Sequence, residues 1–419
     1  MKILFLHALA DPSRGGGAEV IVWEQLRSLQ TAGHDCVLLA TSDRAGLHQE
    51  LRDGVRVWLA GTRNLYWPYD GRTHNPAARA LWHTQDSYNP WMQGYLRQVI
   101  AAEKPDVISM HNLPGWSAAA WITASRAGIP AVQVLHDSYA ICPKATMYTN
   151  GGNCARQCAG CRAFRLPHRV LSNRLRAVVG VSRYVLERHL AEGYFAQVPI
   201  KQVIHNARDP RALGIDEPVA VEPHGGIRFG YIGRLDPPKG VEPLIDAFRQ
   251  LPQPDAELWI AGAGKPGYEA SLRQRAQGDT RIRFLGRVLP RAFYPQVDVV
   301  VVPSLCHDNL PGVVVESFAF GKPVIGARRG GIPELIRDGV NGWILEPAQA
   351  GALYETMSHL ARNSGVIEHM AQTARQDGMK FMDPRSWNNQ YLQVYSAVSA
   401  DSCSADPQHQ QRSSRAGDA

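Results

Sequence analysis

Short apolar runs of strand length alternate with amphipathic helical patterns along most of the chain. In the first half, these runs occupy residues 2–7, 36–40, 106–110, 131–135, 177–181 and 201–204. In the second half, runs of the same kind occupy 227–232, 257–261, 282–285, 298–302 and 323–326. Continuous apolar runs of this length are typical of strands buried on both faces, and their alternation with helices indicates a parallel sheet. The pattern therefore predicts an α/β protein with two doubly wound, Rossmann-like sheets.

One stretch rich in Pro, Gly, Asp and Glu interrupts this rhythm and predicts an interdomain linker. The resulting division is a first domain over 1–205, a linker over 206–226, a second domain over 227–382, a helix over 383–400 that returns to the first domain, and a tail over 401–419. The tail has no apolar period, so we expect it to be disordered. Parallel sheets bind ligands beyond the carboxyl ends of their strands, so the expected active site is the cleft between the domains.

The composition fits this division. The 419 residues are 44% hydrophobic and 20% charged, which suits two globular domains rather than a fibrous or disordered chain. No run approaches the roughly 20 consecutive apolar residues that span a bilayer. Residues 1–10 include Ala8-Leu9-Ala10, which is similar to a signal-peptidase site. The same residues fit a buried first strand, and cleavage would remove that strand from the sheet. This interpretation favours a cytoplasmic chain.

The net charge is +7, from 45 basic and 38 acidic side chains. This balance suits anionic partners, namely a phosphorylated ligand, nucleic acid or the inner face of an anionic membrane. The chain has no long Lys/Arg run with interleaved aromatic residues, so nucleic acid is not an expected partner. Peripheral membrane contact stays open, and so does a solvated basic surface without a partner.

The loop 230–240 places two cations, Arg234 and Lys239, between a strand and a helix that begins near Val241. Two cations beside a helix N-terminus suit the double charge of a diphosphate, and the prolines between them stiffen the loop. A solvated surface loop could carry the same pair, but the position directly after a buried strand favours a binding role.

The stretch 303–325 carries two carboxylates, Asp308 in the loop after a strand and Glu316 eight positions later in the next helix. The first could accept hydrogen bonds from sugar hydroxyls and the second from a ribose diol, while the helix N-terminus between them offers amides to phosphate. The structural alternative makes Asp308 a helix cap and places Glu316 on a solvated face.

Together these motifs resemble family 4 of the retaining glycosyltransferases, two-domain enzymes of the GT-B fold that use nucleotide-activated sugars. The matching segments, in the family's order, are Gly15-Gly-Gly-Ala-Glu19, His136-Asp137, Val181-Ser182, His205-Asn206, Gly233-Arg-Leu-Asp236, Lys239-Gly240, the pair Asp308 and Glu316, and Gly330-Gly-Ile-Pro-Glu334. The resemblance implies an acceptor-side first domain that faces a nucleotide-sugar-binding second domain across a cleft.

The resemblance also implies roles for individual residues. Arg234 and Lys239 would hold the donor diphosphate and stabilise the charge of the leaving group without a divalent metal or other catalytic cofactor. Glu316 would bind the nucleotide ribose. Asp308 stands where the family usually has Glu and would contact the donor sugar, and its shorter arm puts the identity of that sugar in doubt. The further implied residues are Gly16 and Gly17 near donor or acceptor, His136 near the reacting carbon, Asn309, Leu310, Pro311 and Gly312 at the donor sugar, and Arg287 beside the base.

By the same resemblance, the reaction is hexosyl transfer with retention, through an oxocarbenium-like state, to a saccharide or lipid-linked acceptor in cell-surface polysaccharide or glycolipid biosynthesis. A nucleotide-sugar epimerase and a phosphorylase are rival enzymes, and the latter would need a pyridoxal-phosphate lysine that no motif singles out. A non-catalytic sugar-nucleotide-binding scaffold is the non-enzymatic alternative.

Four of the seven cysteines cluster in an insert over 137–165: Cys142, Cys154, Cys158 and Cys161. In a cytoplasmic chain, thiolates stay reduced and four of them can complete a tetrahedral zinc shell, so the first hypothesis is a structural zinc site. An iron–sulfur cluster is the second, and plain thiols, or two disulfides in an exported chain, are the others. The spacing also resembles that of radical S-adenosylmethionine enzymes, but the fourth cysteine and the position in mid-domain argue against them.

The loop 61–90 and the residue that follows it carry six aromatic side chains among polar ones: Tyr66, Trp67, Tyr69, Trp82, Tyr88 and Trp91. Aromatic rings stack on sugars and also lie at membrane surfaces. The loop therefore predicts an acceptor site, a membrane-touching edge, or packing over the core.

Overall fold

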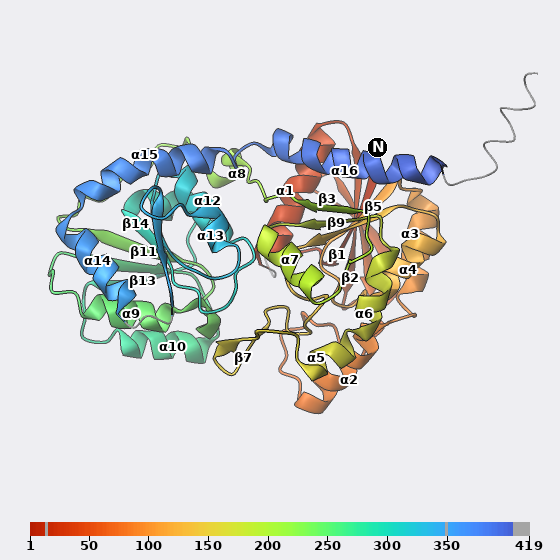
Figure 1. Ribbon diagram of the computed structural model, residues 1–419, viewed down its shortest axis with the longest axis horizontal. Coiled ribbons are helices and arrows are strands. Elements are labelled where there is room, and N and C mark those ends of the chain that lie inside the picture. The colour runs from red at the N-terminus through yellow and green to blue at the C-terminus, as the bar shows by residue number, and fades with distance from the viewer. Residues whose placement is uncertain (13–15, 348–350, 405–419) are drawn as a thin grey trace, which may run out of the picture.

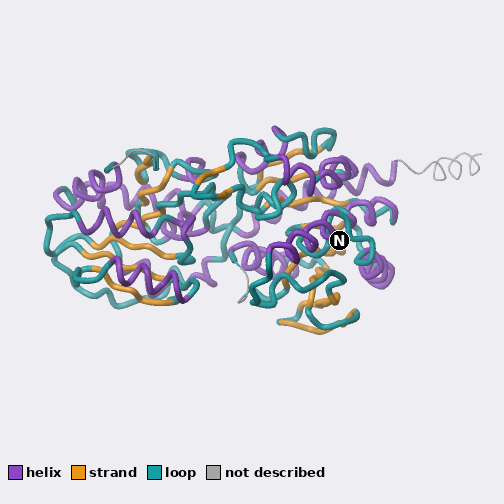
Figure 2. Tube along the Cα trace, turned by 90° about the horizontal axis from the view of Figure 1, so that it is seen from below, coloured by secondary structure: helices purple, strands orange, loops and turns teal. Residues whose placement is uncertain are grey.

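The computed structural model describes residues 1–12, 16–347 and 351–404, which form two α/β domains side by side along the long axis (Figure 1 and Figure 2). Each domain is built on one sheet of mainly or wholly parallel strands with helices packed against it. The two Rossmann-like sheets expected from the apolar runs are present. Within the described residues, no helix is long and apolar enough to cross a membrane.

The sheet of the first domain has the strand order β10-β9-β6-β5-β1-β2-β4-β3. Its strands are β1 Lys2–Leu9, β2 Asp35–Ser42, β3 Leu47–Arg52, β4 Val55–Gly61, β5 Val107–Met110, β6 Ala131–Leu135, β9 Ala177–Gly180 and β10 Ile200–Val203. Only β3 is antiparallel, and it pairs with β4 at the edge. Strand β1 lies between β5 and β2, and all its residues after Lys2 are buried. Burial on both faces explains the continuous apolar run at the start of the chain.

The helices of the first domain include several that begin at a side-chain cap. They are α1 Gly17–Thr31, α2 Pro76–Ser87, α3 Gln93–Glu103, α4 Ala119–Arg126, α5 Ala159–Phe164, α6 Leu166–Leu171, the 3-10 turn η1 Ser172–Arg174 and α7 Arg183–Ala191. Asn75 accepts a hydrogen bond from the Ala78 amide (2.8 Å) at the start of α2, and Ser182 accepts one from the Val185 amide (3.2 Å) at the start of α7. These caps satisfy amides that have no partner within the helix and so fix where each helix begins.

The sheet of the second domain is fully parallel, with the order β13-β12-β11-β14-β15-β16. Its strands are β11 Arg228–Ile232, β12 Glu257–Ala261, β13 Ile282–Gly286, β14 Val299–Val302, β15 Val324–Ala327 and β16 Gly342–Leu345. Its helices are α8 Pro210–Leu213, η2 Pro237–Lys239, α9 Val241–Arg249, α10 Pro266–Arg275, α11 Pro290–Phe293, η3 Tyr294–Gln296, α12 Gly312–Ala319, α13 Ile332–Leu335, α14 Ala352–Arg362 and α15 Gly365–Met379.

Alternate residues of β14 enter two different cores, one on each face of this sheet. Val299 and Val301 pack with apolar residues of α9, α10 and α14. Val300 and Val302 pack with residues of α12, α13 and α15. A strand that is apolar at every position is therefore required here, because both of its faces are covered.

Two segments connect the domains. The segment 206–226, predicted as a linker, contains α8 and buries Leu213 and Ile215 in a core of the second domain. The last helix, α16 Pro384–Ser404, returns along the first domain, where Asn388 donates to Ser28 Oγ (2.7 Å) and Tyr395 donates to Ser109 Oγ (2.8 Å) (Figure 1). Helix α16 extends to Ser404, so the first four residues of the segment 401–419, expected to be disordered, are helical, and the rest of that segment lies outside the described residues.

Three strands of the two main sheets were not expected from the apolar runs: β3, β4 and β16. Strand β3 has no fully buried residue, because it is an edge strand. Strands β4 and β16 are only partly buried, so neither presents a continuous apolar run. Hydrophobic patterning alone does not distinguish such strands from loops.

Candidate active site

The closest pair among the predicted donor residues is Lys239 and Asp308. Lys239 ends the turn η2 after β11, and Asp308 lies in the loop between β14 and α12. The Lys239 ammonium donates to Asp308 Oδ1, and the Ser304 hydroxyl donates to Asp308 Oδ2. Burial alone would lower the pKa of Lys239, but the Asp308 carboxylate outweighs it and raises that pKa. Lys239 is thus held as a cation at this edge of the sheet.

Backbone packing fixes the approach of these two loops. A side chain at Gly240, whose φ is +73°, would lie 2.1 Å from the carbonyl oxygen of Pro303. The Leu305 amide also donates to the carbonyl of Pro238 (2.9 Å). Only glycine permits so close an approach of the two backbones. The loop that carries Asp308 therefore requires glycine at the position after Lys239.

Glu316 lies inside α12 and is almost fully buried, contrary to the solvated-face alternative. Its Oε1 accepts a hydrogen bond from the Arg208 guanidinium, and its Oε2 accepts one from the Tyr294 hydroxyl (2.9 Å). Arg208 also lies 3.1 Å from Glu24 Oε2 on α1 of the first domain. Burial raises the pKa of Glu24, against the opposing effect of Arg208. The carboxylate expected to bind ribose is therefore linked through one arginine to the opposite domain.

Arg234 and Arg287 both lie beyond the carboxyl ends of strands of the second sheet. Arg234 follows β11 and Arg287 follows β13. The Arg234 side chain is 68% exposed and its nearest anion is Asp236, at 3.8 Å. It is therefore free to reach a ligand, unlike Lys239. Arg287 follows β13, two strands away from β11, and is exposed. The structure brings Arg234 close to the Lys239–Asp308 pair and leaves Arg287 further along the edge.

The segment from Asn309 to Gly312 connects Asp308 to α12 and touches both domains. Asn309 donates to the carbonyl of His136 (3.0 Å), and Leu310 packs against the cores of both domains. Pro311 is the N-cap of α12, and Gly312 is its first residue. Proline has no N–H, so Pro311 cannot offer an amide to a ligand.

His136 follows β6 and belongs to a group of histidines in the first domain. Its Nε2 lies 2.8 Å from His111 Nδ1, and His111 Nε2 lies 3.1 Å from Ser109 Oγ. Burial, reinforced by the charge of His7, lowers the pKa of His136 to about 3. His136 is therefore neutral near pH 7 and acts as a hydrogen-bonding group. Its backbone carbonyl accepts a hydrogen bond from Asn309, in the loop that carries Asp308.

The start of α1 supplies the predicted glycines of the first domain. The Gly16 amide donates to Glu19 Oε2 (2.6 Å), and Glu19 Oε1 lies 3.9 Å from His7 Nε2. A side chain at Gly17 would meet no atom of the described residues within 4 Å. The motif's first residue, Gly15, lies outside the described residues.

A second contact joins the domains through Glu334 on α13. Its carboxylate accepts from the amides of Arg183 and Tyr184 (2.8 Å each), in the first turn of α7, and lies 3.1 Å from His205 Nε2. An anion at a helix N-terminus is favourable because it compensates the helix dipole. The closing Glu of the Gly-Gly-Ile-Pro-Glu motif therefore holds the second domain against the first.

Sequence reasoning missed three residues that complete the site: Arg208, Tyr294 and Ser304. Ser304 is four positions before Asp308 and could have been found as a local hydrogen-bond partner. Arg208 and Tyr294 contact Glu316 from 108 and 22 positions away. No local pattern indicates such contacts.

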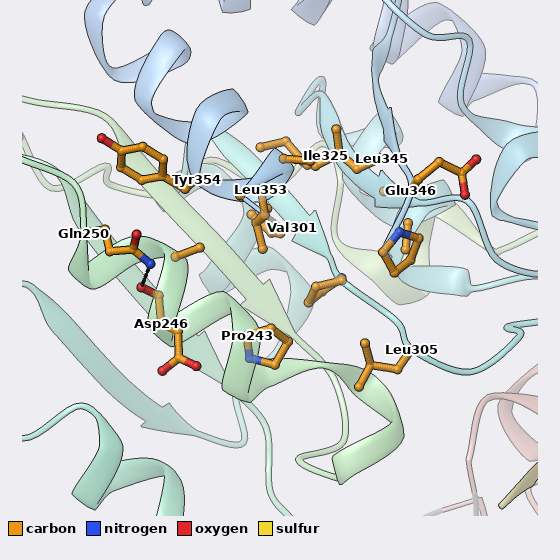
Figure 3. Close-up of a pocket in the computed structure, with 17 residues that line it drawn as sticks. Pro243, Asp246, Gln250, Val301, Leu305, Ile325, Leu345, Glu346, Leu353 and Tyr354 are labelled. Atoms are coloured by element: carbon orange, nitrogen blue, oxygen red, sulfur yellow. Dashed lines mark hydrogen bonds between the residues drawn. The ribbon is translucent and has the colours of Figure 1, made fainter. Parts of the chain in front are cut away.

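A cavity of about 250 Å³ lies beside this site, between α9, α14 and the ends of β14 to β16 (Figure 3). Its lining is mainly apolar and includes Pro243, Val301, Leu305, Ile325, Leu345 and Tyr354. None of the predicted donor residues lines it. It touches the loop 303–311 between β14 and α12, which carries Asp308 and is called the donor loop below, through Pro303 and Leu305.

The aromatic side chains of the loop 61–90 and of Trp91 differ in burial. Trp82 is buried, and Trp67 is buried with its indole N–H donating to Thr41 Oγ1 (2.9 Å). Tyr66 stacks on His74, with 3.5 Å between ring centroids. Trp91 is 56% exposed. Trp67 and Trp82 thus pack in the interior, and Trp91 is the exposed one of the three tryptophans.

The four insert cysteines are free thiols. Cys161 Sγ lies 3.8 Å from Cys142 Sγ, and Cys158 Sγ accepts from the Cys161 amide (3.5 Å). Among the described residues, no group of three or more His, Cys, Asp or Glu side chains stands ready to hold a metal ion. The zinc site therefore stays a prediction.

Two family models match the chain. A "Glycosyl transferase 4-like domain" covers residues 16–206, and "Glycosyl transferases group 1" covers residues 226–363. The chain belongs to the group 1 glycosyltransferases, which confirms the family expected from the motifs.

The relatives agree with this assignment. An uncharacterized 42.6 kDa protein in the cps region of Klebsiella pneumoniae is 30% identical over 350 residues, which are 83% of this chain and 91% of that protein. Sucrose-phosphate synthase from Thermosynechococcus elongatus has a TM-score of 0.74 at 18% identity, over 96% of this chain and 99% of that one. HepE of Anabaena, in complex with UDP-glucose, has a TM-score of 0.65 at 21% identity, over 95% of this chain and 100% of that one. These structures are glycosyltransferases of the GT-B fold, so the expected fold is confirmed.

Proposed function

We propose that this glycosyltransferase moves a hexosyl group from a nucleotide-sugar donor to a saccharide or lipid-linked acceptor, with retention of the anomeric configuration. The observation that carries the proposal is the convergence of Lys239, Asp308 and Glu316 around one loop, at the carboxyl edge of the second sheet. The UDP-glucose in the Anabaena HepE complex, on a similar fold, supports a nucleotide-sugar donor.

Each side chain has a distinct task in this proposal. Glu316 accepts hydrogen bonds from the ribose diol, and Asp308 accepts them from the donor sugar. Lys239 and the exposed Arg234 face the diphosphate and stabilise the negative charge that develops as it leaves. Before donor binding, Asp308 already holds Lys239 in place, so the cation needs little reorganisation when the diphosphate arrives.

The reaction replaces one bond to the anomeric carbon by another. The bond between that carbon and the diphosphate oxygen breaks, and a bond to the acceptor oxygen forms on the same face. The acceptor proton passes to the leaving phosphate oxygen. In this proposal, neutral His136, whose backbone carbonyl accepts a hydrogen bond from Asn309, forms a hydrogen bond with the sugar during this step.

The decisive experiment is a panel of nucleotide sugars. A ligand at 100 times its dissociation constant stabilises a protein by about 2.7 kcal/mol, which a thermal unfolding assay detects readily. The donor that stabilises the protein is then incubated with saccharide and lipid-linked acceptors, and NMR of the product gives the anomeric configuration.

The outcomes separate the alternatives. A new glycosidic bond with the donor's configuration supports the proposal, and an inverted product refutes retention. A nucleotide sugar returned with one inverted carbon identifies an epimerase. Sugar phosphate formed from a glycan and inorganic phosphate identifies a phosphorylase. Stabilisation without turnover on any acceptor identifies a scaffold.

We also infer that the protein contacts an anionic membrane through the face formed by α2, α5 and α6. Three apolar side chains of this face are more than half exposed: Leu81, Leu166 and Val170. The stretch 156–176 beside them contains six arginines and no Asp or Glu. Exposed apolar side chains among cations suit the surface of an anionic bilayer.

Vesicle sedimentation tests this contact. Phosphatidylglycerol vesicles should bind the protein more strongly than phosphatidylcholine vesicles, and Leu166→Ser with Val170→Ser should weaken the binding. Val221→Ser is the control, because Val221 is also more than half exposed (52%) but lies in the segment 206–226, away from this face. Equal binding to both kinds of vesicle, or an unchanged affinity of the double variant, would refute this contact.

A further inference from the structure

The cysteine insert carries a small hairpin that reaches from the first domain to the second (Figure 1). Its strands are β7 Tyr148–Thr149 and β8 Gly152–Asn153, and its base is closed by the Cys154 amide, which donates to the carbonyl of Met147 (2.8 Å). Two strands of two residues each cannot hold themselves in place, because even longer isolated hairpins are marginal in water. The insert therefore needs a further constraint.

The last residue of the second hairpin strand, Asn153, contacts the loop that carries Asp308. Asn153 Nδ2 donates to the carbonyl of Leu305 (2.7 Å), and the His307 amide donates to Asn153 Oδ1 (3.1 Å). One side chain thus uses both of its polar atoms on the backbone just before Asp308. His307 is also packed against Tyr184 of the first domain, with 4.9 Å between ring centroids.

The four cysteines surround the base of the hairpin. Cys142 precedes it and Cys154 follows it directly, while Cys158 caps α5 and Cys161 lies within that helix. In a tetrahedral zinc–thiolate shell, zinc–sulfur bonds of about 2.3 Å give sulfur–sulfur separations of about 3.8 Å. The Cys142 and Cys161 sulfurs are already 3.8 Å apart.

We propose that Cys142, Cys154, Cys158 and Cys161 bind one zinc ion, and that this ion fixes the hairpin that holds Asn153 against the donor loop. The side chains of Cys154 and Cys158 must turn toward the Cys142–Cys161 pair to close the shell. Both have room to do so, since Cys154 is only partly buried and Cys158 is exposed. The zinc site does not depend on the reaction, whereas the effect of Asn153 on donor binding rests on the proposed function.

Metal analysis of the full chain, purified without added metal, tests the site. We expect close to one zinc per chain, and after chelation one equivalent of Co²⁺ should restore a shell with the absorption of tetrahedral cobalt thiolate. Cys154→Ser should lower metal retention at least tenfold, and Cys403→Ser, outside the insert, should not. Less than about 0.2 zinc per chain together with no cobalt absorption overturns the proposal, and so does a brown iron–sulfur chromophore.

Hydrogen exchange tests the connection to the donor loop without relying on turnover. Asn153→Ala keeps the four cysteines but removes the acceptor of the His307 amide, so exchange around 305–309 should accelerate at least tenfold while zinc is retained. Chelation of the parent protein should produce the same acceleration. Unchanged exchange after zinc removal refutes the link between the metal and the loop.

Kinetics then define Asn153 as a positioning residue. Once a donor is known, Asn153→Ala should raise the donor KM about tenfold with a smaller change in kcat, and zinc removal from this variant should add little. Asn153→Asp keeps the acceptor of the His307 amide and should fall between the parent and Asn153→Ala. Donor KM values equal to the parent's in both variants refute the positioning role.

Discussion

The Arg208 guanidinium forms an ion pair with the Glu316 carboxylate, and the same guanidinium lies 3.1 Å from Glu24 on the other domain. Arg208 therefore connects α1 of the first domain to the helix expected to hold the donor ribose. A ribose diol that binds Glu316 must share its carboxylate with Arg208 or displace it. If Glu316 binds the ribose as proposed, donor binding and the position of the two domains are coupled through this contact.

Replacement of Arg208 by Ala should destabilise the protein. The change leaves two largely buried carboxylates, Glu24 and Glu316, without their shared cation, and such a loss costs about 3 kcal/mol. Urea unfolding of the full chain measures this cost. The double variant Arg208→Ala with Glu316→Gln should lose less than the sum of the single losses, because it leaves one buried charge fewer. Strict additivity would show that the ion pair contributes nothing.

Replacement of Lys239 by Ala should lower glycosyl transfer about 100-fold, the scale of losing one preorganised charge at a leaving group. The variant also leaves Asp308 without its cation, so Lys239→Ala with Asp308→Asn should be assayed alongside it. Lys265→Ala is the control, since Lys265 is an exposed lysine at the start of α10. Transfer at the parent's rate by Lys239→Ala would contradict the role of this residue.

Replacement of Glu316 by Gln should raise the donor KM and lower transfer about 100-fold, because the charged acceptor for the ribose diol is lost while the shape of the side chain is kept. Donor titration and initial rates measure both effects. Glu368→Gln, on the exposed face of α15, is the matched control and should behave as the parent. An unchanged donor KM would move ribose recognition to another residue.

Replacement of Gly331 by Ala should disturb the donor loop. A Cβ atom there would lie 1.9 Å from the carbonyl oxygen of Asn309 and 3.1 Å from Ser182 Cβ of the first domain, so the loop and the domain contact must shift. We expect at least a tenfold loss of transfer, measured by initial rates. Gly267→Ala should leave the rate unchanged, because a side chain at Gly267 meets nothing within 4 Å. Equal rates in the two variants would contradict the close approach.

Replacement of Asp137 by Asn should stabilise the protein at neutral pH. Burial, opposed by the Tyr139 amide, raises the pKa of Asp137 to about 6, whereas an unfolded Asp titrates near 4. The folded state thus binds the proton more tightly, and stability falls as the pH rises from about 4 to 6. Asn keeps the acceptor for the Tyr139 amide (2.8 Å) and has no charge to bury.

The expected gain follows from a difference of about two pKa units, which corresponds to about 3 kcal/mol. Urea unfolding at several pH values should show this gain above pH 6.5 and almost none at pH 4. A gain that does not vary with pH would show that the carboxyl of Asp137 titrates normally in the folded protein.

The sequence by itself determined the two parallel sheets and the family, and it predicted the donor residues. Buried parallel strands must be apolar at every position, and the loops after them carry the ligand-binding side chains. Both features can therefore be recognised from short local sequence patterns. Lys239, Asp308 and Glu316 were predicted as donor residues for this reason. The spacing of four cysteines likewise predicted a metal site that remains a proposal.

Only the tertiary structure decided which groups meet across the two domains. Arg208 reaches Glu316 over 108 positions, Glu334 reaches α7 over about 150, and Asn153 reaches the donor loop over 152. Such contacts depend on how two independently patterned domains pack together, and no periodicity of either domain encodes that packing. The strands β3, β4 and β16 were not predicted, because a polar or partly exposed strand shows no continuous apolar run.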